Sequence, residues 1–267
     1  MKALLLTGLL FILILPGCRK ETSILPLLQS VEELIPMYAD SASVLLDSIQ
    51  APDELTDKDF AHWCMLCGKV TDEAATGLLP IYQWQRAQQW FTEHGTAEEQ
   101  AQIDLYLGRA YVEDGEYDKA MQIYADALQL AKEHQAYNVA GYICAYMADL
   151  YGFRDITSEC LKKREEACEF FKKAENYKSY AYSLKDLAGE WAILDSFACT
   201  IPLLQKADSI SQLLHNKNLT AAIANAFALI YEMQGKYNEA ETAYLKAIST
   251  RSEESYKDSI GLLKVYI

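Results

Sequence analysis

The sequence has little positive charge for its size. Its 267 residues include 24 lysines and arginines against 38 aspartates and glutamates, which gives a formal net charge of −14. Nucleic-acid binding depends on cations that neutralise phosphates, so this imbalance excludes DNA and RNA as expected partners. Hydrophobic residues make up 51% of the chain and charged residues 23%, which is a globular composition, and intrinsic disorder is not expected.

Sequence motifs of catalysis are also missing. The chain has no glycine-rich phosphate loop, no H-E-x-x-H and no G-x-S-x-G. Cys64 and Cys67, with His62 beside them, lack a second pair at a metal-ligand spacing. We expect these two cysteines to pack in a helical core, with a disulfide or redox role left open. We therefore expect no enzyme, no metal site and no cofactor.

The first residues have the composition of a targeting segment. Lys2 precedes an apolar run from Ala3 to Leu15, which is short for a membrane span, and Leu15-Pro16-Gly17-Cys18 follows. This segment resembles the signal peptide and lipobox of bacterial lipoproteins. The resemblance implies that residues 1–17 are removed, that Cys18 is lipidated, and that residues 18–25 form a tether to a membrane. An uncleaved anchor helix and an ordinary secretory signal are the alternatives.

The chain repeats one pattern of small and aromatic residues every 40 residues, in units that we number from Ala101, Gly141, Ala181 and Ala221. Small residues recur at repeat positions 8, 20 and 27, and an aromatic residue recurs at position 11. The small residues are Gly108, Ala148, Ala188 and Ala228; Ala120, Cys160, Thr200 and Ala240; and Ala127, Ala167, Ala207 and Ala247. Antiparallel helices approach closely where facing side chains are small, so the pattern predicts stacked helical hairpins in an all-α fold.

Turn signals lie between the two helices of each predicted hairpin. Gly115, Gly152 and Gly235 mark three of these turns, and Asp195 takes the place of a glycine in the third unit. In that unit we expect the second helix to start late, with Thr200 as its cap and Pro202 in its first turn.

The spacing L-G-x-x-Y…G-x-Y…A-x-x-x-Y-x-x-A, which starts at Leu107 and ends at Ala127, resembles the tetratricopeptide repeat. The resemblance implies an α-solenoid in which the usual 34-residue unit is lengthened to about 40, either in the second helix or in the loop after it. We expect four such repeats over residues 101–251. Degenerate helical hairpins are expected over residues 26–100, where Asp40 or Ser41 caps a helix and Pro80 opens another. A C-terminal capping helix is expected over residues 252–267.

In this repeat family the first helices of successive units line a concave groove. The resemblance therefore implies a partner-binding groove formed by Gln102, Leu105 and Arg109; Tyr142, Ala145 and Asp149; Tyr182 and Lys185; and Ala222, Asn225 and Leu229. Tyr142 and Tyr182 offer flat amphipathic area that suits a peptide or a sugar ring.

The lipobox followed by these repeats resembles envelope-tethered tetratricopeptide lipoproteins of Gram-negative bacteria. The resemblance implies a non-catalytic scaffold that binds a protein or peptide, lipid-anchored in the cell envelope and serving as the sensory part of a regulatory system. The alternative is a glycan-binding lipoprotein of a nutrient-uptake system. No run of 18 or more apolar residues follows Ala247, so we expect that this chain does not itself carry a signal across a membrane.

Overall fold

The computed structural model describes residues 24–74 and 76–250, and this part of the chain contains helices and no strand. The first helices are α1 (Leu25–Asp47), the short 3-10 helix η1 (Pro52–Glu54), α2 (Asp57–Ala74) and α3 (Ile81–His94). They are followed by α4 (Ala97–Glu113), α5 (Tyr117–Glu133), α6 (Tyr137–Phe153), α7 (Thr157–Lys173), α8 (Tyr177–Ile193), α9 (Phe197–Leu213), α10 (Lys217–Met233) and α11 (Tyr237–Thr250). The predicted signal peptide, Cys18 and the predicted capping helix lie outside the described residues.

The 40-residue period consists of two equal halves. Each helix from α4 to α10 has 17 residues. Three residues separate each of these helices from the next. Both helices of a unit are therefore equally long and the loops are short, so neither predicted alternative, a longer second helix alone or a wider loop after it, is correct. The first unit begins at Ala97 behind a Thr96 capping box, four residues before the alignment start at Ala101.

Each of the three-residue connections between α4 and α11 contains one residue with positive φ, at which the chain changes direction. Only two of these seven residues are glycines. The seven recur at intervals of 20 and are Gly115, Gln135, Asp155, Glu175, Asp195, His215 and Gly235. The next backbone N–H then donates to a carbonyl five residues back, as Glu116 does to Tyr111 (2.9 Å) and Ser196 to Trp191 (2.9 Å). This is the Schellman ending of a helix, and it explains why the loops are uniformly short.

The small repeat positions lie where the helices of a hairpin meet. All twelve residues at repeat positions 8, 20 and 27 are buried. Gly108 of α4 lies against the ring of Tyr124 in α5, and a methyl group at Gly108 would lie 2.3 Å from Cε1 of that ring. The predicted hairpins, and with them the all-α solenoid, are confirmed.

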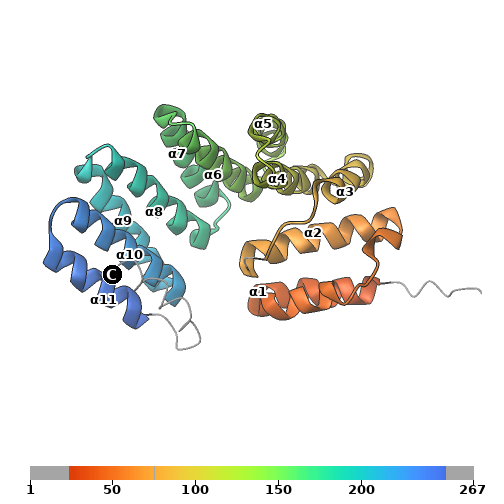
Figure 1. Cartoon of the computed structure of the whole chain (residues 1–267), viewed down its shortest axis with the longest axis horizontal. Coiled ribbons are helices and arrows are strands. Elements are labelled where there is room, and N and C mark those ends of the chain that lie inside the picture. Colours follow the sequence, from red (N-terminus) through yellow and green to blue (C-terminus); the bar gives the residue numbers. More distant parts are fainter. Residues whose placement is uncertain (1–23, 75, 251–267) are drawn as a thin grey trace, which may run out of the picture.

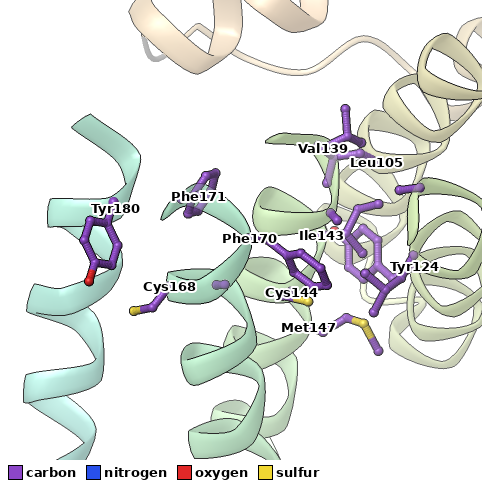
Figure 2. Packing of buried hydrophobic residues seen from close by; sticks show 14 of the residues in the cluster. Leu105, Tyr124, Val139, Ile143, Cys144, Met147, Cys168, Phe170, Phe171 and Tyr180 are labelled. Carbon is purple, nitrogen blue, oxygen red and sulfur yellow. The ribbon is translucent and has the colours of Figure 1, made fainter. Parts of the chain in front are cut away.

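One cluster of buried apolar side chains continues from α4 to α10, and two further clusters lie in α1–α4 and in α8–α10. In Figure 2, Tyr124 of α5 lies beside Leu105 of α4 and Ile143 of α6, and Phe170 of α7 extends toward the same cluster. Each hairpin thus buries its apolar face against the next, which is how a solenoid without a central core becomes stable.

Two local expectations are corrected by the structure. Helix α9 begins at Phe197, so Thr200 is not its cap; the Thr200 hydroxyl donates to the Ser196 carbonyl inside the helix, 3.2 Å away. Pro202 lies within α9 and not in its first turn.

Helix α1 is not capped at Asp40 or Ser41, because it continues through a kink at Tyr38, where φ is −141° and ψ is 55°. Pro36 precedes this kink and cannot donate a helical hydrogen bond.

The stack of helices is curved (Figure 1). Helices α2 and α8 lie on facing sides of the curve, and an ion pair joins them: Lys178 Nζ at the start of α8 lies 2.7 Å from Glu73 Oε2 at the end of α2. Residues 105 apart in sequence therefore meet across the inner side of the solenoid. Among the described residues, no helix is both long and apolar enough to cross a membrane.

The close contact at Gly108 gives a stability prediction. Gly108→Ala should lower the free energy of unfolding by about 1–3 kcal/mol, because the added methyl group displaces the buried Tyr124 ring. Gly189→Ala in α8 is the matched control, since a methyl group there meets no atom within 4 Å. This control should raise the free energy by up to about 1 kcal/mol through helix propensity. Urea denaturation followed by circular dichroism measures both, and equal effects would contradict the packing described.

Candidate functional site: a groove between four first helices

A groove follows the inner side of the curved stack. Its largest hollow has a volume of about 560 Å3 and lies between the end of α2 and the helices α4, α6 and α8. We call this hollow the central groove. Four aromatic residues line it: Tyr142, Tyr146, Phe171 and Tyr182. Because one helix of each successive unit contributes a wall, the 40-residue period itself generates the groove.

At one wall, a largely buried arginine spans two helices. The Arg109 guanidinium of α4 pairs with the Asp72 carboxylate of α2, which also accepts a hydrogen bond from the Tyr106 hydroxyl at 2.8 Å. Arg109 in turn lies over the Tyr146 ring, 4.9 Å from its centroid. Burial raises the pKa of Asp72, while Arg109 and the Tyr106 hydroxyl oppose that rise. Asp72 is thus held in place by partners on α4.

At the opposite wall, Tyr142 is fixed in orientation. Its ring meets Phe171 edge-on, with centroids 4.8 Å apart, and its hydroxyl lies 2.8 Å from Ser179 Oγ. Tyr142 therefore connects α6 with α7 and α8. A tyrosine held at both ends presents a rigid surface, which lowers the entropic cost of binding a ligand.

Behind Tyr182, carboxylates surround one arginine. Arg164 of α7 lies 2.6 Å from Asp149 Oδ1 and 3.5 Å from Glu190 Oε1, with only 12% of its side chain exposed. Asp186 also acts on this arginine, since it contributes to the raised pKa of Arg164 against the opposing effect of burial. Burial raises the pKa of Asp149, and Arg164 opposes the rise.

A second hollow continues along the groove between α8 and α10. Its volume is about 270 Å3, and Asp186 lines both it and the central groove. Lys185, Glu190 and Asn225 are among its other lining residues. We call it the distal hollow.

The structure divides the residues that we predicted for the groove among four places. Arg109, Tyr142, Ala145, Asp149 and Tyr182 meet in the central groove. Lys185, Ala222, Asn225 and Leu229 line the distal hollow. Gln102 lies apart from both, in a hollow of about 320 Å3 between α1, α2 and α4.

Leu105 occupies the fourth place, the core, and its predicted groove position is wrong. Only 1% of its surface is exposed, and it packs beside Tyr124 and Ile143 (Figure 2). Position 5 lies at the edge of the groove face. Ala145, Lys185 and Asn225 take this position in the later units and line the two hollows, whereas in the first unit residues of α5 and α6 cover Leu105.

The sequence analysis missed Asp72, Glu73, Tyr146 and Asp186 as groove residues. Tyr146 and Asp186 both occupy repeat position 6, which had not been included. Asp72 occupies position 12 of a unit that begins one period before Ala101. Gly68 takes the small position 8 of that unit, forty residues before Gly108, so the repeat pattern extends to Asp72.

The buried cysteines and His62 of the described part have contacts typical of side chains that pack in a protein core. The six cysteines of the described part are free thiols. Cys64 is buried and donates weakly to the Gln83 carbonyl, 3.8 Å away, and burial raises the pKa of Cys144 and Cys168 to about 12. His62 packs edge-on against Trp90. Within residues 24–74 and 76–250, no group of three or more histidine, cysteine, aspartate and glutamate side chains is arranged to hold a metal ion.

Comparison with known proteins identifies the repeats. Models of the tetratricopeptide repeat match residues 107–135 and 220–254, which overlap the first and fourth predicted units. No curated protein matches the sequence.

Solved structures with the same arrangement of helices share little sequence with this chain. BtubC (BKLC) from P. vanneervenii superposes with a TM-score of 0.60 at 16% identity, over 88% of this chain and 94% of its own. RapI in its apo form gives 0.61 at 13% identity, over 85% and 65%. A Rap protein complexed with Competence and Sporulation Factor gives 0.60 at 15% identity, over 89% and 68%. The described chain is thus a tetratricopeptide-like solenoid, a fold that is typically a non-catalytic scaffold suited to binding other proteins.

The Arg109–Asp72 pair gives a prediction with a pH signature. Arg109→Met removes the ion-pair partner of Asp72 and leaves the Tyr106 hydroxyl as its remaining partner among the described residues. Because the partly buried carboxylate is then unpaired, the free energy of unfolding should fall by about 2–3 kcal/mol at neutral pH. Without Arg109 the pKa of Asp72 rises further above its unfolded value. The loss should therefore shrink as the pH falls through that raised pKa, because folding then takes up a proton.

Urea titrations at neutral and mildly acidic pH measure this dependence. The double variant Asp72→Asn, Arg109→Met is the control, and it should recover most of the loss at neutral pH. A loss of equal size at both pH values would show that Arg109 acts through packing alone.

Proposed function

We propose that this chain is a scaffold that binds a protein or peptide partner in the central groove. The observation that carries the proposal is the groove itself, where rigidly held aromatic and charged side chains from α2, α4, α6 and α8 line one hollow. Phe171 belongs to the apolar core and Tyr142, Tyr146 and Tyr182 pack against it, whereas the charged side chains of the groove lie outside that core.

The fold neighbours support a binding role. The Rap protein that superposes on this chain was solved in a complex with Competence and Sporulation Factor. The hollow here is open along the inner side of the stack, and an extended segment that crosses it would meet four helices in succession. No reaction is included in the proposal, because the groove carboxylates Asp72 and Asp149 are held by arginines.

The scaffold is further proposed to be anchored to a membrane of a bacterial cell envelope through a lipid on Cys18, as a sensory component of a regulatory system. The support for the anchor is the sequence Leu15-Pro16-Gly17-Cys18 behind an apolar segment. A multiply acylated cysteine binds membranes almost permanently, since each buried CH₂ group adds about 0.8 kcal/mol. The first described helix begins at Leu25, so only a short tether would separate the lipid from the folded part.

Site-specific crosslinking tests the groove. A photoreactive phenylalanine analogue at Tyr182, introduced in the native host, should form a covalent adduct with a protein, and the adduct should disappear when Tyr142→Ala is added. The matched control places the same analogue at Glu169, an exposed residue of α7. Equal adducts from both positions would contradict the proposal. Tight binding to a polysaccharide panel that is lost with Tyr142→Ala and Tyr182→Ala would favour the glycan-binding alternative instead.

Metabolic labelling tests the anchor. In cells grown with an alkyne fatty acid, the native chain should be labelled and should sediment with membranes. Cys18→Ser should remove the label and release the protein from the membrane fraction, because the lipid supplies the membrane affinity. Cys199→Ser, which alters an exposed cysteine of α9, should change neither result. A Cys18→Ser protein that still sediments would point to an uncleaved anchor helix.

A further inference from the structure

The two connected hollows carry an excess of negative charge. Six carboxylates line the central groove and the distal hollow together, against three cationic side chains: Arg109, Lys178 and Lys185. The carboxylates are Asp72, Glu73, Glu113, Asp149, Asp186 and Glu190. With Arg164 packed behind them, the carboxylates still outnumber the cations. A concave surface with one sign of charge focuses its field on a ligand of the opposite sign.

The carboxylates differ in how firmly they are paired. Asp72 is held by Arg109 and Tyr106, and Asp149 by Arg164, so these two are committed to the fold. Asp186 forms one ion pair within the described residues, with its neighbour Lys185 at 2.5 Å, where both side chains are about one third exposed. Such a partly exposed pair contributes little energy and is easily replaced.

Glu113 is the loosely held carboxylate at the other end of the groove. It is exposed at the end of α4 and lines the central groove. No ion pair of Glu113 is found among the described residues. Glu113 and Asp186 are therefore the carboxylates that can take a new cation without releasing a buried one.

The aromatic rings of the groove already bind cations of the chain itself. The Arg109 guanidinium lies over Tyr146, and Lys185 Nζ lies 6.0 Å from the centroid of Tyr182. Ring faces beside carboxylates are a favourable environment for ammonium and guanidinium groups.

The distal hollow also offers an unused hydrogen-bond acceptor. Asn225 Oδ1 is enclosed and has no hydrogen-bond partner among the residues that the structure describes. A ligand that brings donors and no acceptor satisfies both this oxygen and the carboxylates beside it. Lysine and arginine side chains meet that description.

From these observations we infer that the partner segment is basic, and that a lysine or arginine side chain of that segment binds between Asp186 and the Tyr182 ring. The inference rests on the proposed function, because it names the chemistry of the peptide that the same groove would hold. Glu113 at the other end of the central groove binds a second basic residue of the segment. An acidic peptide or an anionic membrane is disfavoured by the same charges.

Fluorescence anisotropy with labelled synthetic peptides tests the inference on the full chain. The probes are four extended peptides of equal length that differ only at two positions, which carry lysine, arginine, glutamine or glutamate. The lysine and arginine peptides should bind more tightly than the glutamine peptide, and the glutamate peptide should bind most weakly. The preference should shrink between about 50 mM and about 500 mM salt, because screening weakens exposed charge pairs.

A matched pair of double variants locates the charge effect. Glu113→Gln with Asp186→Asn should weaken binding of the arginine peptide roughly three- to tenfold and leave the glutamine peptide unchanged. Glu169→Gln with Glu241→Gln makes the same change in net charge at exposed residues of α7 and α11, away from the groove, and should have no effect. A circular dichroism melt of each variant checks that it is folded.

The outcomes separate the two proposals. If the glutamate or glutamine peptide binds as well as the basic ones, and Tyr142→Ala abolishes that binding, the groove binds peptides but the inferred basic partner is wrong. If the basic peptides bind and both double variants weaken them equally, only the net charge of the chain is being detected, and the site is wrong. If none of the four peptides binds while the Tyr182 crosslink also fails, the proposed function itself is contradicted.

Discussion

Close approach of the two helices in each hairpin is the constraint on which the structure depends. The twelve small residues at repeat positions 8, 20 and 27 are all buried, and the contact between Gly108 and the Tyr124 ring leaves no room for a methyl group. This spacing lets each hairpin nest against the next with a constant offset. Because the offset is constant, the first helices stay on the inner side of the curve, and side chains 37 residues apart come within hydrogen-bonding distance, as Arg109 and Asp72 do.

Local signals in the sequence predicted the hairpins and the turn inside each of them, but not the turns between hairpins at Gln135, Glu175 and His215. Gly115 and Gly235 adopt positive φ, as expected of turn glycines, yet Gln135, Asp155, Glu175, Asp195 and His215 adopt it too. Each non-glycine residue in this conformation costs roughly 1–2 kcal/mol. The hairpin packing on both sides of the turn determines the backbone there, so propensity at a single residue could not reveal it. The late start predicted for α9 failed for the same reason: Thr200 and Pro202 suggest a helix start, but the 20-residue rhythm places that start at Phe197.

Groove residues could be predicted from the sequence where their repeat position alone places them in the groove. They could not be predicted where their position depends on contacts between helices that are far apart in the sequence. Arg109, Tyr142, Asp149 and Tyr182 follow from their repeat positions, and they meet in the central groove. Leu105 shows the limit of that reasoning, since it is buried in the core although Ala145 and Lys185 at the same repeat position line the hollows. The Glu73–Lys178 pair depends on the accumulated curvature of three units, and no sequence pattern records it. The carboxylate excess of the groove likewise emerges only when α2, α4, α6 and α8 are placed side by side.

The central claim is that the first helices form the surface that contacts a partner. Hydrogen–deuterium exchange of the chain, alone and bound to the protein recovered by crosslinking, tests it most directly. The account predicts slower exchange on binding in α2, α4, α6 and α8, with α5, α7 and α9 unchanged. Protection confined to the second helices, or spread equally over both helices of each hairpin, would contradict it.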